Sequence, residues 1–299
     1  MQRPIRLFQY AYILKNYVFQ QRQPFLASFK ITYRCNLTCQ QCPFYNLEST
    51  ELSYEQACTT LDILYQRGNR MVIFEGGEPY LWKDGEYHLA DLVNYARRLF
   101  FSVGITTNGT LPLHTTADVL WVSLDGLTET HNRLRGAPIF ERVLHNIQAC
   151  QHPRLYAHIT INAINAAEIP HLVRFLNGKV RGITIQFYYP YNRQDALFLD
   201  FERRATLLDE LILLKHSGLP ILNSTAALHA LKRNTWRCDD HLIDNANPDG
   251  TFSQGCYLKN RTDIDCSKCG FSPHTEISLA CRGNVGSILA GRRIFFLVV

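Results

Sequence analysis

Three cysteines lie close together near the start of the chain, at Cys35, Cys39 and Cys42. Thiolates are the usual ligands of iron–sulfur clusters, and a short loop can bring three of them to one cluster. A four-iron cluster held by three thiolates keeps one iron without a protein ligand, so that iron is open to a small molecule. The alternatives are a zinc site, which generally closes with four ligands, or a set of buried reduced thiols. We interpret the C-x3-C-x2-C spacing as that of a cluster-binding loop.

A second group of cysteines lies in the C-terminal part of the chain, at Cys238, Cys256, Cys266 and Cys269. The turn sequence Asn247-Pro248-Asp249-Gly250 would fold the chain back and bring the first two thiols together. Four thiolates can close one site around zinc or hold one iron–sulfur cluster. The sequence therefore predicts an auxiliary metal centre here, and the ligand type favours a second iron–sulfur cluster over zinc.

Strand-like and helix-like segments alternate from about residue 26 to residue 220, which predicts βα units around a parallel sheet. The predicted strands are 26–32, 71–75, 101–106, 119–124, 155–162 and 182–187. The predicted helices are 53–67, 86–99, 138–151, 167–177 and 201–216. Such a series fits either an open doubly wound sheet or a barrel. In both, the chemistry belongs at the carboxyl ends of the strands, and the first cysteine loop follows the first strand.

Polar residues follow the next strands at the same predicted edge. Gly76 and Gly77, which let backbone approach a ligand closely, come after the second strand and precede the carboxylate of Glu78. The third strand is followed by Asn108, and the fourth by Asp125. Asp125 is a candidate catalytic acid or base, although Asp-Gly is also a common turn dipeptide.

The cysteine spacing, the Gly-Gly-Glu sequence and these strand ends together resemble the radical S-adenosylmethionine (SAM) superfamily. The resemblance implies a 4Fe–4S cluster on Cys35, Cys39 and Cys42. SAM would bind the open iron through its amine and carboxylate, and an electron from the cluster would cleave it to a 5′-deoxyadenosyl radical. One departure is Gln41, where many members carry an aromatic residue; Phe44 or Tyr45 is the alternative neighbour for the adenine.

The same resemblance assigns residues to SAM. Gly-Gly-Glu would hold the methionine amine. Asn108 after strand three and Ser123 at the end of strand four would lie by the ribose and the carboxylate. Arg135 would pair with the SAM carboxylate because a planar guanidinium suits it, and Arg133 is its competitor. The predicted cofactor-binding residues are Gly76, Gly77, Glu78, Asn108, Ser123 and Arg135.

The resemblance also selects the barrel. We predict an α/β fold, a partial (β/α)6 TIM barrel with a small cysteine-rich C-terminal extension. The predicted divisions are an N-terminal amphipathic helix at 1–25, the barrel at 26–220 and the extension at 221–299. The extension is loosely similar to the SPASM and twitch extensions that hold auxiliary clusters in radical enzymes modifying peptides and small molecules. A full SPASM set carries seven cysteines, so only one auxiliary centre is expected.

Composition limits the classes of function. The 299 residues, 46% of them hydrophobic, suffice for a large core. The net charge of +5 is spread along the chain, which predicts no nucleic-acid partner. Ten cysteines without a secretory signal pattern predict a reducing cytoplasm. Residues 1–22 predict a basic amphipathic helix, which would either dock on the barrel or lie on a membrane surface.

The expected function is therefore a radical SAM enzyme that modifies an organic substrate, either a peptide or a small metabolite. An electron donor such as flavodoxin or ferredoxin is implied. A membrane lipid is the alternative substrate, because the N-terminal helix resembles the arrangement in adenosylhopane synthases. A non-catalytic iron–sulfur or zinc redox sensor is the alternative of another class.

Overall fold

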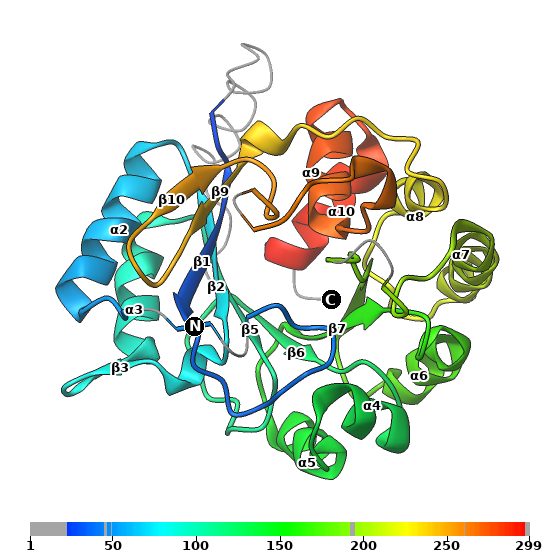
Figure 1. Cartoon of the computed structure of the whole chain (residues 1–299), viewed down its shortest axis with the longest axis horizontal. Coiled ribbons are helices and arrows are strands. Elements are labelled where there is room, and N and C mark those ends of the chain that lie inside the picture. The colour runs from blue at the N-terminus through cyan, green and yellow to red at the C-terminus, as the bar shows by residue number, and fades with distance from the viewer. Residues whose placement is uncertain (1–22, 45–46, 49, 192–194, 260, 297–299) are drawn as a thin grey trace.

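A computed structural model describes residues 23–44, 47–48, 50–191, 195–259 and 261–296. Its main feature is one curved eight-stranded sheet with helices around its outer side (Figure 1). The strand order is β10-β9-β1-β2-β5-β6-β7-β8, and all neighbouring pairs are parallel except β9 with β10. The predicted N-terminal helix falls almost entirely outside the described residues, so it stays a prediction.

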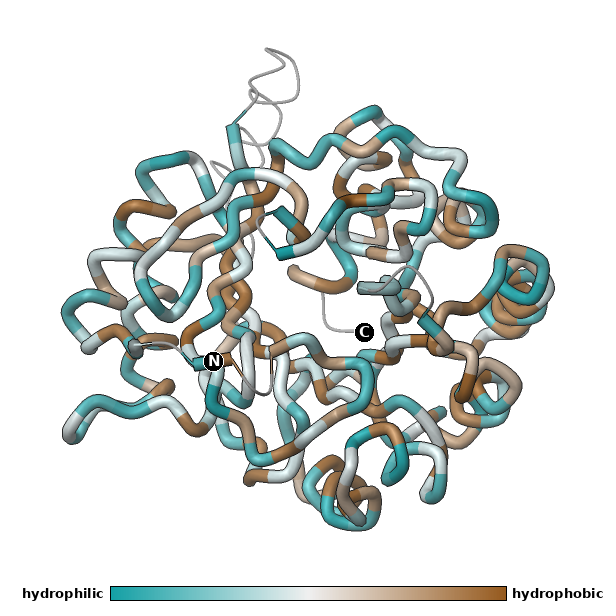
Figure 2. The backbone as a smooth tube through the Cα atoms, viewed as in Figure 1, coloured by the Kyte–Doolittle hydropathy of each residue, from teal (hydrophilic) through white to brown (hydrophobic). Residues whose placement is uncertain are grey.

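Six parallel strands form the barrel wall. They are β1 (Leu26–Thr32), β2 (Met71–Gly76), β5 (Ser102–Thr107), β6 (Val119–Ser123), β7 (Leu155–Ile161) and β8 (Gly182–Phe187). Most of their residues are buried, as expected of strands covered on both faces. Figure 2 shows this as hydrophobic colour along the central strands, with hydrophilic residues frequent on the outer loops.

The helices that follow these strands cover the outside of the sheet. They are α2 (Tyr54–Gln66), α3 (Leu89–Leu99), α4 (Thr128–Arg135), α5 (Phe140–Ala149), α6 (Ile169–Leu176), α7 (Phe201–His216) and α8 (Thr225–Leu231). The predicted capping box of α2 is present, because Ser53 and Gln56 cap each other's backbone N–H groups. In α3 the buried residues recur every three or four positions and form one apolar face. A small hairpin, β3 (Lys83–Asp84) and β4 (Tyr87–His88), precedes α3.

The C-terminal part of the chain is joined to the barrel. β9 (Ile243–Ala246) pairs in parallel with β1, and β10 (Phe252–Gln254) pairs with β9. α9 (Ser272–Cys281) and α10 (Val285–Phe295) fill the side between β10 and β8 (Figure 1). The end of α10 packs beneath β5 to β7, where its Phe295 carbonyl accepts from Arg154 and Ser102. The expected extension from residue 221 is thus part of the barrel wall.

A buried ion pair fastens β9 to the barrel. Asp244 on β9 is 1% exposed and accepts two hydrogen bonds from Arg67, at 2.8 and 2.9 Å, and one from Asn69 at 2.8 Å. Arg67 ends α2 and Asn69 lies in the loop before β2. The pair therefore connects a C-terminal strand to the first βα unit.

Replacing Asp244 tests this connection. Asp244→Ala leaves Asn69 and Arg67 without their acceptor, and we expect the free energy of unfolding to fall by about 2 kcal/mol. Urea unfolding followed by tryptophan fluorescence measures it. The matched control is Glu210→Ala, which removes a half-exposed pair with Arg174 and should change stability by less than about 0.5 kcal/mol. Equal losses in both variants would contradict the proposed anchoring.

Candidate active site

The cysteine loop lies at the carboxyl end of β1, as predicted, and its three thiols line the large central cavity. A turn brings the last two together, with the Cys42 N–H donating to the Cys39 carbonyl at 3.1 Å. Burial, together with the nearby Cys39 and Cys42, raises the pKa of the Cys35 thiol to about 11. Metal ligation by thiolates must therefore release protons here.

Gly76 and Gly77 dock the cysteine loop against the end of β2. A Cβ atom at Gly76 would overlap the Thr32 carbonyl oxygen, and one at Gly77 would overlap that of Arg34. The Gly77 N–H donates to the Thr32 carbonyl at 2.7 Å. Both glycines line the cavity, but the close approach that requires them is to the loop's own backbone. Their evident role in the chain is to position the three thiols.

Glu78 was expected to hold the methionine amine, and the structure places it differently. The side chain is fully buried and is not among the described cavity residues. Its carboxylate accepts from Thr107 Oγ1 at 2.8 Å, from the Asn108 N–H at 2.7 Å and from the Tyr80 N–H at 3.2 Å. Burial raises its pKa to about 7. Glu78 therefore fixes the end of β5 in place of facing a ligand.

Asn108 and Ser123 do reach the cavity. The Asn108 amide nitrogen donates to Asn36 Oδ1 at 2.8 Å and lies 3.9 Å from Cys35 Sγ. Ser123 ends β6 and is half-buried in the same wall. These two predicted residues are thus brought to the same mouth as the thiols.

Arg135 is held beside the cluster loop by Asp125. Its Nη2 lies 2.6 Å from Asp125 Oδ2, and its Nη1 lies 3.8 Å from Cys39 Sγ. Burial lowers the pKa of Arg135, but the Asp125 carboxylate outweighs this effect and holds that pKa above its usual value. Its buried Nε has no hydrogen-bond partner among the described residues. A buried donor without an acceptor at the cavity wall suits an anionic ligand.

Asp125 is not the substrate-facing acid or base that we expected. It is fully buried, and its carboxylate also accepts from Gln41 Nε2 at 2.6 Å and the Thr160 N–H at 2.9 Å. Gln41 in turn accepts from Asn162 at 3.1 Å. Gln41, which stands where many radical SAM proteins carry an aromatic residue, thus joins a polar network that positions Arg135. The sequence offered no signal for this link, because Gln41 and Asp125 are far apart along the chain.

Aromatic rings cover the cavity next to the cysteine loop. Phe44 is buried and stacks on Tyr33, with ring centroids 5.6 Å apart, and it meets Tyr257 edge-on at 5.7 Å. Phe44 and Tyr257 both line the cavity, and the place of Phe44 beside the adenine stays a prediction. Tyr45 lies outside the described residues.

The four C-terminal cysteines gather near α9. The charges of Cys269, Cys256 and Cys266 all affect the Cys238 thiol, whose pKa burial raises to about 12. Cys238 Sγ lies 3.9 Å from His274 Nδ1. In the described part of the chain, no three His, Cys, Asp or Glu side chains converge in a way that could hold a single metal ion.

A buried cation lies beside this group. Arg204 on α7 is fully buried, and its Nη1 donates to the Cys269 carbonyl at 2.9 Å. Its Nε and Nη2 have no partner among the residues that the structure describes. Its guanidinium packs on Phe187 and Phe201, 4.4 and 4.8 Å from the ring centroids. Burial lowers its pKa to about 10, so it still carries its charge and needs an anion nearby.

Comparison with known proteins identifies the domain. Residues 29–176 match the model of the Radical SAM superfamily. This segment, just under half of the chain, is a radical SAM domain. Members of the superfamily use a 4Fe–4S cluster and SAM, and the relatives named next are enzymes or biosynthesis proteins.

Two curated relatives illustrate the similarity. An Fe-coproporphyrin III synthase of Methanosarcina barkeri is 34% identical over 162 residues, which cover 50% of this chain and 40% of that protein. The subtilosin biosynthesis protein AlbA of Bacillus subtilis is 31% identical over 127 residues, 38% of this chain and 27% of AlbA. The chain spans less than half the length of these relatives.

Solved structures confirm the fold. Streptococcus suis SuiB bound to SAM superposes with a TM-score of 0.65 at 13% identity, covering 95% of this chain and 70% of SuiB. SuiB has also been solved bound to its precursor peptide SuiA. At this identity the likeness establishes the architecture, a partial TIM barrel with an extension.

The glycine contact gives a direct test of the site. Gly77→Ala should push the cysteine loop away from β2, because the new Cβ would overlap the Arg34 carbonyl. We expect iron bound after anaerobic reconstitution to fall several-fold. Gly291→Ala, in open space within α10, is the control and should bind iron as the wild type does. Full iron binding by Gly77→Ala would refute the docking role.

Proposed function

We propose that the chain is a radical SAM enzyme that cleaves SAM reductively and modifies an organic substrate in its central cavity. The observation that carries this proposal is that three thiols and Arg135, whose Nε has no partner among the described residues, line the same end of that cavity. When bound, a 4Fe–4S cluster on Cys35, Cys39 and Cys42, together with SAM, supplies one electron and a 5′-deoxyadenosyl radical.

The chain's own residues orient SAM. Arg135 is free to donate from Nε to the SAM carboxylate, while Asp125 holds the other side of the guanidinium at 2.6 Å. Asn108 and Ser123 offer polar groups to the ribose and carboxylate from the adjacent strand ends. A guanidinium fixed by a buried carboxylate loses little conformational entropy on binding a second anion.

Water must be kept from a reactive radical, and the aromatic cover suits this task. Phe44, Tyr257 and the tyrosines after β8 surround the mouth with apolar ring surface. No helix in the described ranges is long and apolar enough to cross a membrane.

We further propose one auxiliary metal centre on Cys238, Cys256, Cys266 and Cys269. Four thiolates make such a centre anionic. The centre would therefore supply the negative charge that the buried Arg204 guanidinium needs as a partner. Zinc would draw four sulfurs to about 2.3 Å from one point. Thiolate ligands suit both metals, and on ligand type we propose an iron–sulfur cluster over zinc.

The substrate is proposed at the level of an organic molecule. AlbA and SuiB, whose names or structures refer to a bacteriocin and a precursor peptide, make a peptide one candidate. A small metabolite and a membrane lipid are the others. An electron donor such as flavodoxin or ferredoxin, and membrane contact through residues 1–22, stay predictions. The intact thiol set and Arg135 support an enzyme over a redox sensor.

Cleavage of SAM is the test of the class. Anaerobically reconstituted wild type with dithionite should produce 5′-deoxyadenosine, and Cys39→Ala should lose more than about 99% of it, because two thiolates do not retain the cluster. Chromatography of the product measures the loss. The control, Cys58→Ala, removes a half-buried thiol of α2 and should keep its activity. Absence of product from loaded wild type would favour the sensor.

Arg204 tests the auxiliary centre without an activity assay. In metal-free protein, Arg204→Met removes an unpaired buried cation and should raise the free energy of unfolding by about 1 kcal/mol. In reconstituted protein the same change should lower iron per chain, as Cys269→Ala should. The exposed neighbour Arg203 supplies the control, Arg203→Met, which should alter neither quantity. Unchanged iron in both Arg204→Met and Cys269→Ala would remove the auxiliary centre.

A further inference from the structure

One cavity of about 1230 Å³ runs from the cysteine loop to the inner sides of α9 and α10. This volume exceeds the roughly 300–1,000 Å³ of common ligand pockets, so it has room for SAM and a second molecule. Away from the cysteine loop the wall is largely apolar. It includes Leu26, Met71, Ile73, Trp121, Ile277 and Phe295.

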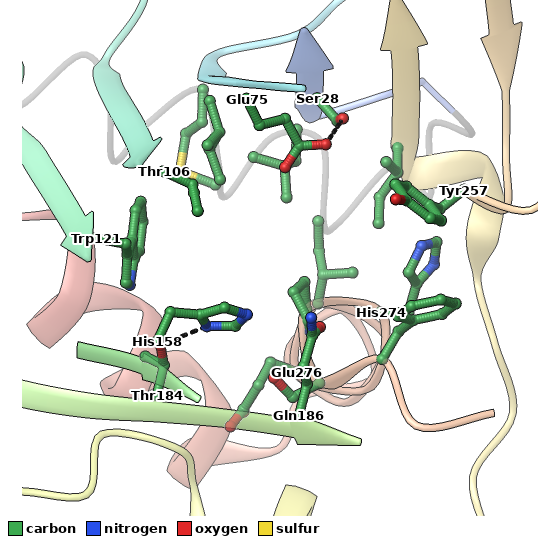
Figure 3. A pocket seen from close by; sticks show the side chains of 18 of the residues that line it. Ser28, Glu75, Thr106, Trp121, His158, Thr184, Gln186, Tyr257, His274 and Glu276 are labelled. Carbon is green, nitrogen blue, oxygen red and sulfur yellow. Dashed lines mark hydrogen bonds between the residues drawn. The ribbon is translucent and has the colours of Figure 1, made fainter. Parts of the chain in front are cut away.

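An ion pair interrupts this apolar wall. Lys30 on β1 and Glu75 on β2 are register partners, and Lys30 Nζ lies 3.2 Å from Glu75 Oε1. Ser28 bridges them, accepting from Lys30 at 2.9 Å and donating to Glu75. The Lys30 side chain is 1% exposed and packs on the Tyr257 ring, whereas that of Glu75 is 28% exposed. Glu75 thus presents its carboxylate to the cavity (Figure 3). Lys30 also lines the cavity, but its side chain is almost fully buried beside that carboxylate.

The two groups keep each other charged. Burial lowers the pKa of Lys30 to about 8, which leaves the ammonium largely protonated at neutral pH. Burial raises the pKa of Glu75, but the positive charge of Lys30 outweighs this effect and holds that pKa below its usual value. The pair therefore adds two opposite charges and no net charge to the wall.

The other titratable groups of the described wall add little net charge near Glu75. His158 points into the cavity from the opposite side, and burial lowers its pKa to about 4, as it does for His274 (Figure 3). Glu276 is occupied, because it accepts from the Ser224 N–H at 2.6 Å and hydroxyl at 2.8 Å.

Three arginines complete the set of cations around the cavity. Arg135 is paired with Asp125 at the mouth. Arg292 is exposed on the last turn of α10, at the opposite end. Arg261 stacks on Tyr257 at 4.8 Å and is not among the described cavity residues. Its charge nevertheless lowers the pKa of both Lys30 and Glu75 and so helps to keep Glu75 ionised.

A charged ligand placed at Glu75 would upset this balance. An anion would face the carboxylate, and a cation would compete with Lys30 for it in surroundings of low polarity. A neutral donor can bind the free side of the carboxylate without either penalty. We propose that the cavity takes an uncharged, mostly apolar molecule whose hydroxyl or amide N–H donates to Glu75, and that the Lys30–Glu75 pair sets this specificity. The inference rests on the proposed function only in naming that molecule as the substrate.

Three probes with one chain and different head groups test the proposal: 1-octanol, octanoate and octylammonium. Calorimetric titration into the full chain reconstituted with iron and SAM gives their dissociation constants at neutral pH. We expect 1-octanol to bind about tenfold more tightly than either charged probe. A preference for a charged probe, or no measurable binding of 1-octanol, would overturn the proposal.

Charge variants give the sharper test. Glu75→Gln leaves Lys30 unpaired and should shift the preference to octanoate, whereas Lys30→Met leaves Glu75 unpaired and should shift it to octylammonium. In the double variant Lys30→Met/Glu75→Gln both positions are uncharged, so the preference for 1-octanol should return. A restored preference also shows that the single variants did not change it by misfolding. Glu276→Gln alters an occupied carboxylate and should keep the wild-type order.

The same order of the three probes in Glu75→Gln and Lys30→Met as in wild type would refute the specificity role. Production of 5′-deoxyadenosine by the same preparations is measured separately. If the selectivity follows the charges but that product is absent, the enzyme class fails while the cavity's specificity stands. If the product forms and the selectivity does not follow the charges, only the present inference fails.

Discussion

The close contact between the cysteine loop and the end of β2 is the constraint on which the candidate site depends. Backbone carbonyls of Thr32 and Arg34 lie where side chains would begin at Gly76 and Gly77. Only glycine permits this approach, and the approach determines where the loop that carries the three thiols lies relative to the end of β2. Glu78, next in sequence, then accepts from Thr107 and the Asn108 N–H, so the same segment fixes the next strand end. One short sequence thereby determines the relative positions of thiols and polar groups.

Each of three buried or partly buried carboxylates in the barrel pairs with a basic side chain from another element. Asp125 holds Arg135, Glu75 holds Lys30, and Asp244 holds Arg67. Removing ions from water is unfavourable unless they are paired, so each pair also fixes a distance between two elements. The cation of the first pair retains an unpaired donor, and the carboxylate of the second remains open to the cavity. These two exceptions mark the positions where a ligand can complete the network.

Much of the barrel could be predicted from the sequence, because its signals are local. β1, β8 and α7 have the predicted bounds, since apolar runs or periodic faces end at clear turn or capping residues. β9 was missed because its sequence Ile-Asp-Asn-Ala shows no strand pattern. Its Asp244 is acceptable in a buried strand only because Arg67 and Asn69 reach it from a distant part of the chain.

The sequence predicted which residues lie at the barrel mouth better than it predicted which of their side chains face the cavity. The sequence placed Glu78 and Asp125 at the barrel mouth, but their buried partners turn both carboxylates away from the cavity. The carboxylate that does face the cavity is Glu75, for which two local signals existed: a lysine inside an apolar strand, and a glutamate directly before the glycine pair. Neither signal indicates that the two residues are paired, because register across neighbouring strands depends on the whole sheet.

The C-terminal segment makes the cavity and the auxiliary cysteines parts of one wall. The Gly270 carbonyl accepts from the Phe187 N–H at 2.9 Å, which joins the Cys266–Cys269 segment to the end of β8. Arg204 connects the same segment to α7, and His274 both lines the cavity and lies 3.9 Å from Cys238. A metal that gathered these thiols would therefore tighten the part of the wall that holds His274, which lies across the cavity from Glu75 (Figure 3). With the proposed auxiliary metal centre, the loading of these cysteines and the shape of the cavity would be linked, because both depend on α9 and its preceding loop.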